Sequence, residues 1–225
     1  MCAEKNNFAK LVNELSSPTA ATAERAADTL NSIIYPNWSS GPGPHVITWS
    51  DENTRQTHFP ALQRPEIIDP LIAALRLGSE FAREYAATVF GMICDEHALA
   101  PLIDALQDRC ASVRSAAARS LGWFQSSAPV PGLIRALGDA SPQVREAAIS
   151  ALGYIRSSEA VPALTELFHN GNLKCQSHAL YALGMIGDAE SLPLARVSLS
   201  HKLREVRKAA KAVLGMYDLK RRAAK

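Results

Sequence analysis

The chain has 225 residues and a formal net charge of +2, with 47% hydrophobic and 6% aromatic residues. The length is sufficient for one continuous core or for an array of repeats, and the small net charge gives no support for a strongly basic nucleic-acid binder. Abundant alanine and leucine with few aromatics favour helices over a β-sandwich.

Cysteine usage and hydropathy limit the class of protein further. The cysteines are scattered and form no CxxC pair, which argues against a structural zinc site and a redox dithiol. No stretch reaches the ~18–20 apolar residues that a membrane helix requires, and MCAEKNNFAK does not resemble a signal peptide. We therefore expect a cytoplasmic protein with free thiols and no membrane insertion.

Residues 1–35 are predicted to form a helical unit. FAKLVNEL and AERAADTLNSII carry the apolar spacing of two helices but lack the proline and the glycine that mark the units further along the chain. We interpret this segment as a degenerate N-terminal repeat.

Residues 36–65 interrupt the helical pattern. Five prolines and two glycines in PNWSSGPGPHVITWSDENTRQTHFPALQRP exclude a long helix. The segment also contains Trp38, Trp49, His45 and His58, and a disordered linker seldom carries two tryptophans. We expect an insertion that forms an ordered flap, and we include Trp49, His45 and His58 among the candidate binding residues.

Residues 66–218 form five repeats with a period of 31 residues. The period is marked by Gly91, Gly122, Gly153, Gly184 and Gly215, and prolines recur in step at Pro70, Pro101, Pro131, Pro162 and Pro193. Each unit contains a first helix that begins near the proline, a polar turn, and a second helix such as VREAAISALGYI. With the N-terminal unit, this pattern predicts an all-α fold, an α-solenoid of about six HEAT-like helix pairs.

The second helices are expected to bury one face each. Counted from the glycine, positions −9, −5, −2, −1 and +2 are mostly apolar, as in Val144, Ala148, Ala151, Leu152 and Ile155. An arginine recurs at position −8, with Asp108 six residues before Arg114 and Asp139 six residues before Arg145. We predict that each such pair bridges the turn and the second helix within one repeat, as a structural feature.

Position +1 after the glycine is large although it lies off the expected core face. Its residues share a helix face with positions −3 and −6. Together these positions supply the candidate binding residues Tyr85, Arg119, Trp123, Tyr154, His178, Tyr181 and Met185. Second helices commonly line the concave side of a solenoid, where partners bind, and such side chains are enriched at binding surfaces. The alternative is that the +1 side chains pack between adjacent repeats, with His178 as a hydrogen-bonded spectator.

Residues 219–225 are predicted to be a basic C-terminal tail. From Arg196 onward the chain has ten Lys/Arg and two acidic residues, so its end is basic and the remainder acidic. The segment is either an interaction tail or a solvated capping helix.

Catalytic motifs are absent from the sequence. No GxSxG, P-loop or GxGxxG occurs, and the histidines are dispersed without cysteines at ligand spacing. We assign no catalytic residue and no metal ligand.

The repeat unit P-x-L-I-x-A-L-x-D-x-x-x-x-V-R-x-x-A-A-x-A-L-G-x-I resembles the HEAT-like repeat named for phycobiliprotein lyases, over about 66–218. That family includes E/F-type lyase subunits, which attach or transfer phycocyanobilin, and NblB-type proteins, which assist phycobilisome degradation and chromophore detachment. Deoxyhypusine hydroxylase has a similar architecture and binds iron through repeated His-Glu pairs, but this chain has only the reversed Glu96-His97 pair.

The resemblance implies a lyase-like protein that detaches or attaches the chromophore of a phycobiliprotein, phycocyanin or allophycocyanin. Phycocyanobilin would be its ligand or substrate, stacked on Trp123 and Tyr154 with its propionates near Arg119. His178 or Tyr181 would exchange a proton with the bilin. Two alternatives stay open: a protein-interaction scaffold without a small ligand, and, more remotely, a nucleic-acid-binding solenoid, which would need a continuous cationic track.

Overall fold

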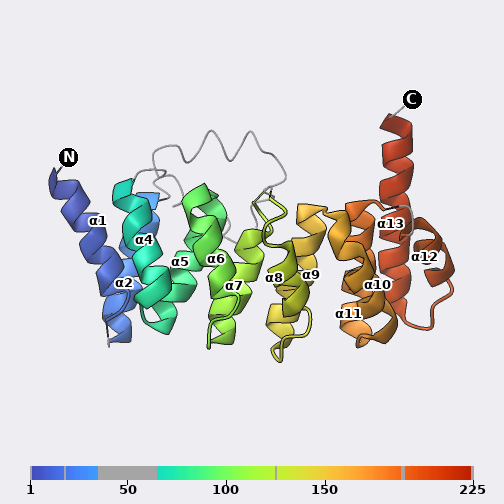
Figure 1. The fold of residues 1–225 in the computed structure, drawn as a ribbon, viewed down its shortest axis with the longest axis horizontal. Helices are drawn as coiled ribbons and strands as arrows, with labels where there is room; N and C mark the ends of the chain where they lie inside the picture. The colour runs from blue at the N-terminus through green and yellow to red at the C-terminus, as the bar shows by residue number, and fades with distance from the viewer. Residues whose placement is uncertain (1, 18, 35–64, 125, 189–190, 224–225) are drawn as a thin grey trace.

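The structure is a computed structural model that describes residues 2–17, 19–34, 65–124, 126–188 and 191–223. Within these ranges the chain is a single row of stacked helix pairs running from the N-terminus to the C-terminus (Figure 1). The first helices are α1 (Cys2–Glu14), α4 (Pro65–Leu77), α6 (Leu99–Ala105), α8 (Val130–Ala136), α10 (Val161–Asn170) and α12 (Ser191–Ser198). The second helices are α2 (Ala20–Ile34), α5 (Glu80–Ile93), α7 (Ala111–Leu121), α9 (Pro142–Ile155), α11 (Leu173–Ile186) and α13 (Arg204–Ala223).

The arrangement confirms the predicted all-α solenoid. From α5 to α13 each second helix packs against the next one in the row, and each first helix packs against the second helix of its own unit. Two 3₁₀ turns, Glu96–Ala98 and Ser158–Ala160, lead into α6 and α10. Each unit therefore buries its apolar face against its neighbours along the row.

The predicted core positions are buried. In α9, Val144, Ala148, Ala151 and Leu152 are at most 1% exposed, and Ile155 is partly buried against the same core. The equivalent positions −9, −5 and −2 are buried in every second helix from α5 to α13. The 3.6-residue period of these apolar positions thus places one stripe of each second helix in a continuous core.

The recurring glycines permit close approach between neighbouring second helices. A Cβ on Gly122 would lie 2.8 Å from the Cα of Ala151 in the next helix, and a Cβ on Gly153 would lie 3.1 Å from the Cα of Ala182. Gly122 has φ −63°, an ordinary helical value. The glycines are therefore needed because a neighbouring backbone occupies the space of a side chain. Gly215 is different, since nothing in the described part of the chain lies within 4 Å of a Cβ there.

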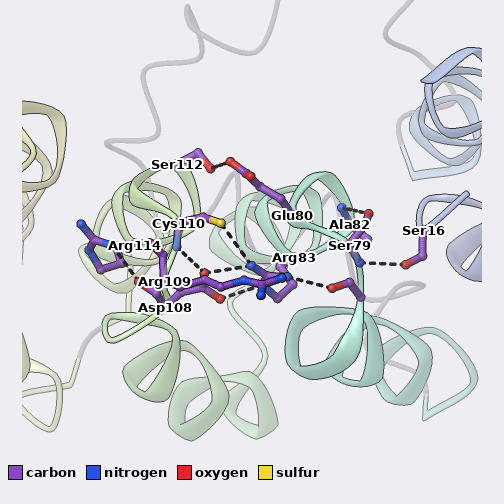
Figure 2. Close-up of polar contacts among 11 residues, drawn as sticks. Ser16, Ser79, Glu80, Ala82, Arg83, Asp108, Arg109, Cys110, Ser112 and Arg114 are labelled. Carbon is purple, nitrogen blue, oxygen red and sulfur yellow. Dashed lines mark hydrogen bonds and ion pairs between the residues drawn. The ribbon is translucent and has the colours of Figure 1, made fainter. Parts of the chain in front are cut away.

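The predicted bridge within one repeat exists only through main-chain carbonyls, which accept from Arg114 and Arg145 at 2.7 Å. The carboxylates of Asp108 and Asp139 instead bind the arginine of the preceding repeat and form a ladder between repeats. Arg83 donates to the carboxylate of Asp108 through Nε at 2.7 Å and Nη2 at 2.9 Å (Figure 2). Arg114 binds Asp139 with the same distances. The residue six positions before Arg114 contributes only its main-chain carbonyl, which accepts from Nη1 at 2.7 Å. Arg83 and Arg114 thus each bind their own turn through Nη1 and the carboxylate of the next repeat through Nε and Nη2.

These ion pairs shift the pKa of both carboxyl groups. The hydrogen bond from Arg114 lowers the pKa of Asp139, and burial opposes that effect less strongly. At Asp108 burial raises the pKa, but the hydrogen bonds from Arg83 and from the Cys110 N–H together outweigh it and the net pKa is lowered. Both carboxylates are therefore held ionised by the ladder at neutral pH.

The two ends of the array differ from its middle. The N-terminal pair packs through α1 on α4, where the Ser79 hydroxyl donates to the Leu15 carbonyl at 3.1 Å and the Ser79 N–H donates to Ser16 Oγ at 3.1 Å. Helix α13 continues to Ala223, through much of the segment predicted as a basic tail. In α4 the repeat proline, Pro70, lies inside the helix, because α4 begins at Pro65.

Most of the 36–65 insertion lies outside the described residues.

Candidate binding surface on the second helices

The centre of the candidate surface is a pair of stacked aromatic rings from neighbouring repeats. Trp123 follows α7 and Tyr154 lies near the end of α9, with ring centroids 5.0 Å apart and planes inclined by 22°. Stacking of this kind contributes about 0.5–1.5 kcal/mol beyond burial. Trp123 is half-buried, whereas Tyr154 is 48% exposed. The +1 side chains therefore pack between repeats, as one of the two alternatives expected, and still leave an aromatic face open.

Met185 continues this row into the next helix. Its Sδ lies 3.3 Å from the point where a Cβ on Gly153 would sit, so the thioether lies beside the residue that precedes Tyr154. The missing side chain at Gly153 makes this position available. Trp123, Tyr154 and Met185 thus form a row across α7, α9 and α11, which we call the aromatic row.

Arg119 and Tyr181 lie one helical turn before the aromatic row. Arg119 precedes Trp123 by four residues, and Tyr181 precedes Met185 by four, so each shares a helix face with its partner in the row. Arg119 is exposed, with Nη1 donating to Ser115 Oγ at 3.3 Å, and Tyr181 is 43% exposed. The Arg119 guanidinium and the Tyr181 phenol therefore lie beside the aromatic row, one turn closer to the N-termini of α7 and α11.

His178 is the exceptional member of its position. The equivalent residues Ala116, Ala147 and Ala209 are small, and the first two are at most 5% exposed. The His178 side chain is half-buried, and its Nδ1 atom is buried with no hydrogen-bond partner in the described part of the chain. An unsatisfied buried nitrogen costs about 1–3 kcal/mol. We therefore expect His178 to lower the free energy of unfolding relative to the alanine found at the equivalent positions. The expectation of a hydrogen-bonded spectator is therefore wrong for Nδ1.

The Tyr85 hydroxyl lies towards α2 and not in the aromatic row. Its hydroxyl approaches the Ala27 carbonyl of α2 at 3.5 Å, and burial raises its pKa, with the charge of Asp28 as a smaller cause. Its ring stacks with Phe81 at 6.5 Å. Phe81, 41% exposed, was not among the predicted residues, although it precedes Tyr85 by four and the helical period would have revealed it. Trp49, His45 and His58 lie outside the described residues.

Charges of both signs lie on the layer of second helices. Glu146 of α9 pairs with Lys174 of α11 at 2.6 Å, and Glu84 lies on the equivalent position of α5. Lys174 is therefore partly neutralised at the middle of the array. This pattern does not provide the continuous cationic track that phosphate binding requires.

The described residues show no metal centre. In the ranges that the structure covers, no group of three His, Cys, Asp or Glu side chains is placed to hold a metal ion. Cys110 and Cys175 are free thiols. Burial is the largest cause that raises the pKa of Cys110, and its hydrogen bond to Glu80 adds to the effect, which favours the protonated thiol over the nucleophilic thiolate.

One hollow lies elsewhere, between α1 and α2. It has a volume of about 610 Å³, is broadly open, and is lined mainly by polar side chains such as Lys10, Asn13 and Ser17. It lies at the N-terminal end of the row, whereas the aromatic row is carried by α7, α9 and α11 (Figure 1). Among the described helices, none is long and apolar enough to cross a membrane.

Comparison with known proteins identifies the repeats. The family model of HEAT repeats matches residues 68–142, 99–174 and 130–215. Among solved structures, the complex of CpcE and CpcF of phycocyanin lyase from Nostoc sp. PCC7120 is similar with a TM-score of 0.57 and 23% identity, over 91% of this chain and 74% of that one. A designed armadillo repeat protein in complex with the peptide (KR)4 is similar with a TM-score of 0.62 and 20% identity, over 93% of this chain and 99% of that one. No curated protein sequence matches the chain. At these identities the structural similarities show the fold alone.

Proposed function

The chain belongs to the HEAT-repeat family, and from this premise we propose that it is a phycobiliprotein-associated, lyase-like member whose aromatic row binds a bilin. The bilin would be phycocyanobilin, either free or carried by phycocyanin or allophycocyanin. The protein would hold the chromophore during its attachment, its transfer or its NblB-type detachment.

The observation that carries the proposal is the stacked pair Trp123–Tyr154 with an exposed face. A linear tetrapyrrole is a flat conjugated system, and stacked aromatic rings offer it a flat apolar surface of matching kind. The Arg119 guanidinium, one turn away, is a suitable partner for a propionate carboxylate. The fold shared with the phycocyanin lyase complex supports the same reading, because a helix-pair array of this kind serves in that complex.

His178 and Tyr181 are the groups that we propose for proton exchange with the bound bilin. The Nδ1 atom of His178 has no partner in the described part of the chain, and the Tyr181 side chain is exposed beside the aromatic row. A buried polar atom without a partner calls for an explanation, and a functional role is one of them. Their role would be to donate or accept a proton at a pyrrole nitrogen or at the thioether linkage.

The test is a titration of the purified protein with phycocyanobilin, followed by holo-phycocyanin, with the visible band and the tryptophan emission recorded. We expect a saturable red shift with quenching of Trp emission, and a loss of both in Tyr154→Ala. The control is Leu77→Ala, because Leu77 in α4 is 87% exposed and remote from the aromatic row. Absence of any spectral change with both probes would refute bilin binding.

A protein-only scaffold is the second candidate, and one observation favours it. Phe81, Tyr154 and Tyr181 are all exposed, on α5, α9 and α11, so exposed aromatic side chains are spread over several repeats. Aromatic side chains are enriched at protein–protein interfaces. If holo-phycocyanin and apo-phycocyanin bind equally well and free bilin does not bind, the scaffold reading replaces the bilin reading.

A further inference from the structure

The ladder between repeats has an asparagine at its third carboxylate position. Asp108, Asp139 and Asn170 are spaced by 31 residues, and each lies three positions before the second helix that follows it. Asn170 is followed directly by Gly171. We propose that Asn170 is a site of deamidation, and that its aspartate product binds Arg145 and completes the third pair of the ladder. This inference does not depend on the aromatic row or on the function proposed above.

Arg145 is held by its own turn in the same way as Arg114. Its Nη1 donates to the main-chain carbonyls of Asp139 at 2.7 Å and Ala140 at 3.0 Å, and Arg114 Nη1 likewise donates to two carbonyls of its own turn. In Arg114 this leaves Nε and Nη2 for the carboxylate of the next repeat. In Arg145 the same two nitrogens have no partner in the described part of the chain. An anchored planar guanidinium with a free edge is preorganised for bidentate binding of a carboxylate.

The Asn170 side chain has no structural task of its own. It is exposed, and its amide forms no hydrogen bond within the ranges that the structure describes. In the two preceding units the ladder carboxylate also accepts from the N–H two residues further along, which closes the turn. In the third unit Asn172 performs this task by accepting from the N–H groups of Lys174 and Cys175. Because an amide has one acceptor oxygen and a carboxylate has two, only the carboxylate matches both free nitrogens of Arg145.

The residue after Asn170 favours deamidation. Gly171 has no Cβ, so its main-chain nitrogen approaches the Asn170 side chain with little steric hindrance. The glycine is also needed by the fold, because a Cβ there would overlap the Leu167 carbonyl oxygen. The Gly171 N–H donates to that carbonyl at 2.8 Å at the end of α10. The reaction therefore requires the last turn of α10 to open, and terminal turns are the part of a helix that opens most readily.

The reaction consumes only water. The Gly171 nitrogen loses its proton and attacks Cγ of Asn170; a C–N bond forms, and the amide nitrogen leaves as ammonia. Water then opens the resulting cyclic imide. Attack at Cγ restores the normal main chain and gives aspartate, whereas attack at the main-chain carbonyl carbon gives isoaspartate. Isoaspartate lengthens the main chain by one carbon, so only the aspartate product retains the geometry of the other ladder carboxylates.

The first experiment tests the modification on the purified full chain. The protein is incubated at mildly alkaline and at mildly acidic pH, and its peptides are mapped by mass spectrometry. We expect conversion of amide to acid at Asn170, faster at alkaline pH because the nucleophile is the deprotonated nitrogen. Asn172 is the internal control in the same peptide. It is followed by Leu173, and its conversion should be roughly tenfold slower or less.

The second experiment tests the pairing with Arg145. Asn170→Asp supplies the aspartate product directly, and Asn170→Gln is the matched neutral control. We expect Asn170→Asp to raise the midpoint of thermal unfolding by roughly 2–4 °C, as one added arginine–carboxylate pair should in a chain of this size. Asn170→Gln should leave the midpoint unchanged. In the background of Arg145→Gln, the rise caused by Asn170→Asp should disappear.

Three results would overturn the proposal. They are conversion at Asn170 no faster than at Asn172, an Asn170→Asp variant no more stable than Asn170→Gln, and a rise in midpoint that persists in Arg145→Gln. Circular dichroism checks that each variant folds. If Arg145→Gln does not fold, Arg145→Lys takes its place, because lysine keeps the charge but lacks the paired donors, and the rise should then be smaller than in the wild-type background.

Discussion

Substitution of the periodic glycines should have opposite effects at two positions of the same repeat pattern. Gly122→Ala places a methyl group between α7 and α9, whereas Gly215→Ala places the same group on the open side of α13. Both variants add one methyl group, at the C-cap of α7 in Gly122→Ala and inside α13 in Gly215→Ala, and only the first meets a neighbouring helix.

The magnitude follows from the distances. A Cβ on Gly122 would lie 2.8 Å from the Cα and 3.1 Å from the Cβ of Ala151. Since non-bonded carbons rest about 3.5–4.0 Å apart, α9 would have to withdraw by roughly 0.7–1.2 Å. Overpacking of this kind costs about 1–3 kcal/mol, and the better helix propensity of alanine offsets at most about 1 kcal/mol. We expect Gly122→Ala to lower the free energy of unfolding by about 1–2 kcal/mol, and Gly215→Ala to raise it by about 0.5–1 kcal/mol.

Thermal unfolding followed by circular dichroism measures both effects. At about 2–4 °C per kcal/mol for a chain of this size, the midpoint should fall by about 4 °C in Gly122→Ala and rise by about 2 °C in Gly215→Ala. Equal effects of the two substitutions, or a Gly122→Ala variant as stable as the wild type, would refute the role of the glycines in close approach.

Three further predictions concern the Arg114–Asp139 pair and the His178 side chain. Arg114→Gln should destabilise the chain by about 2–4 kcal/mol, because it leaves the Asp139 carboxylate without its partner. Urea unfolding of Arg114→Gln, Asp139→Asn and the double variant measures the coupling between the two side chains. Additive effects of the two substitutions would contradict the prediction. Because the pKa of Asp139 is lowered in the folded state, the stability that it contributes should be complete above about pH 5 and disappear as the pH falls through the folded pKa, so the difference between wild type and Asp139→Asn should vanish in acid. His178→Ala should leave the melting temperature unchanged or higher, since it removes an unsatisfied nitrogen, while bilin binding weakens; a marked loss of stability would show that the imidazole has a structural partner.

The sequence by itself determined the architecture of this protein. The 31-residue period and the apolar positions within each second helix require one buried stripe per helix, and a stripe that repeats in register can be buried only by stacking. The observed burial of Val144, Ala148 and Leu152 follows from that period. Local periodicity was sufficient here because each unit contacts only its neighbours.

Sequence reasoning located the candidate surface only in part. Trp123 and Tyr154 were identified from their common position, and they stack. Tyr85 carries the same helical offset as His178, yet it packs towards α2, because the neighbour in that direction is the degenerate N-terminal unit. A helix offset specifies the side on which a residue lies, and the neighbouring helix decides whether it is buried or exposed.

Only the tertiary structure decided which partners the recurring polar residues take. Asp108 is closer in sequence to Arg114 than to Arg83, yet its carboxylate binds Arg83 across the repeat boundary while its carbonyl binds Arg114. The period of the glycines is likewise visible in the sequence. That they permit close helix packing is seen only in the structure, where Ala151 lies opposite Gly122 and Ala182 opposite Gly153. The reason is physical: a period fixes positions along one helix, whereas a hydrogen bond or a close contact depends on the distance between two helices, which the packing of the whole array sets.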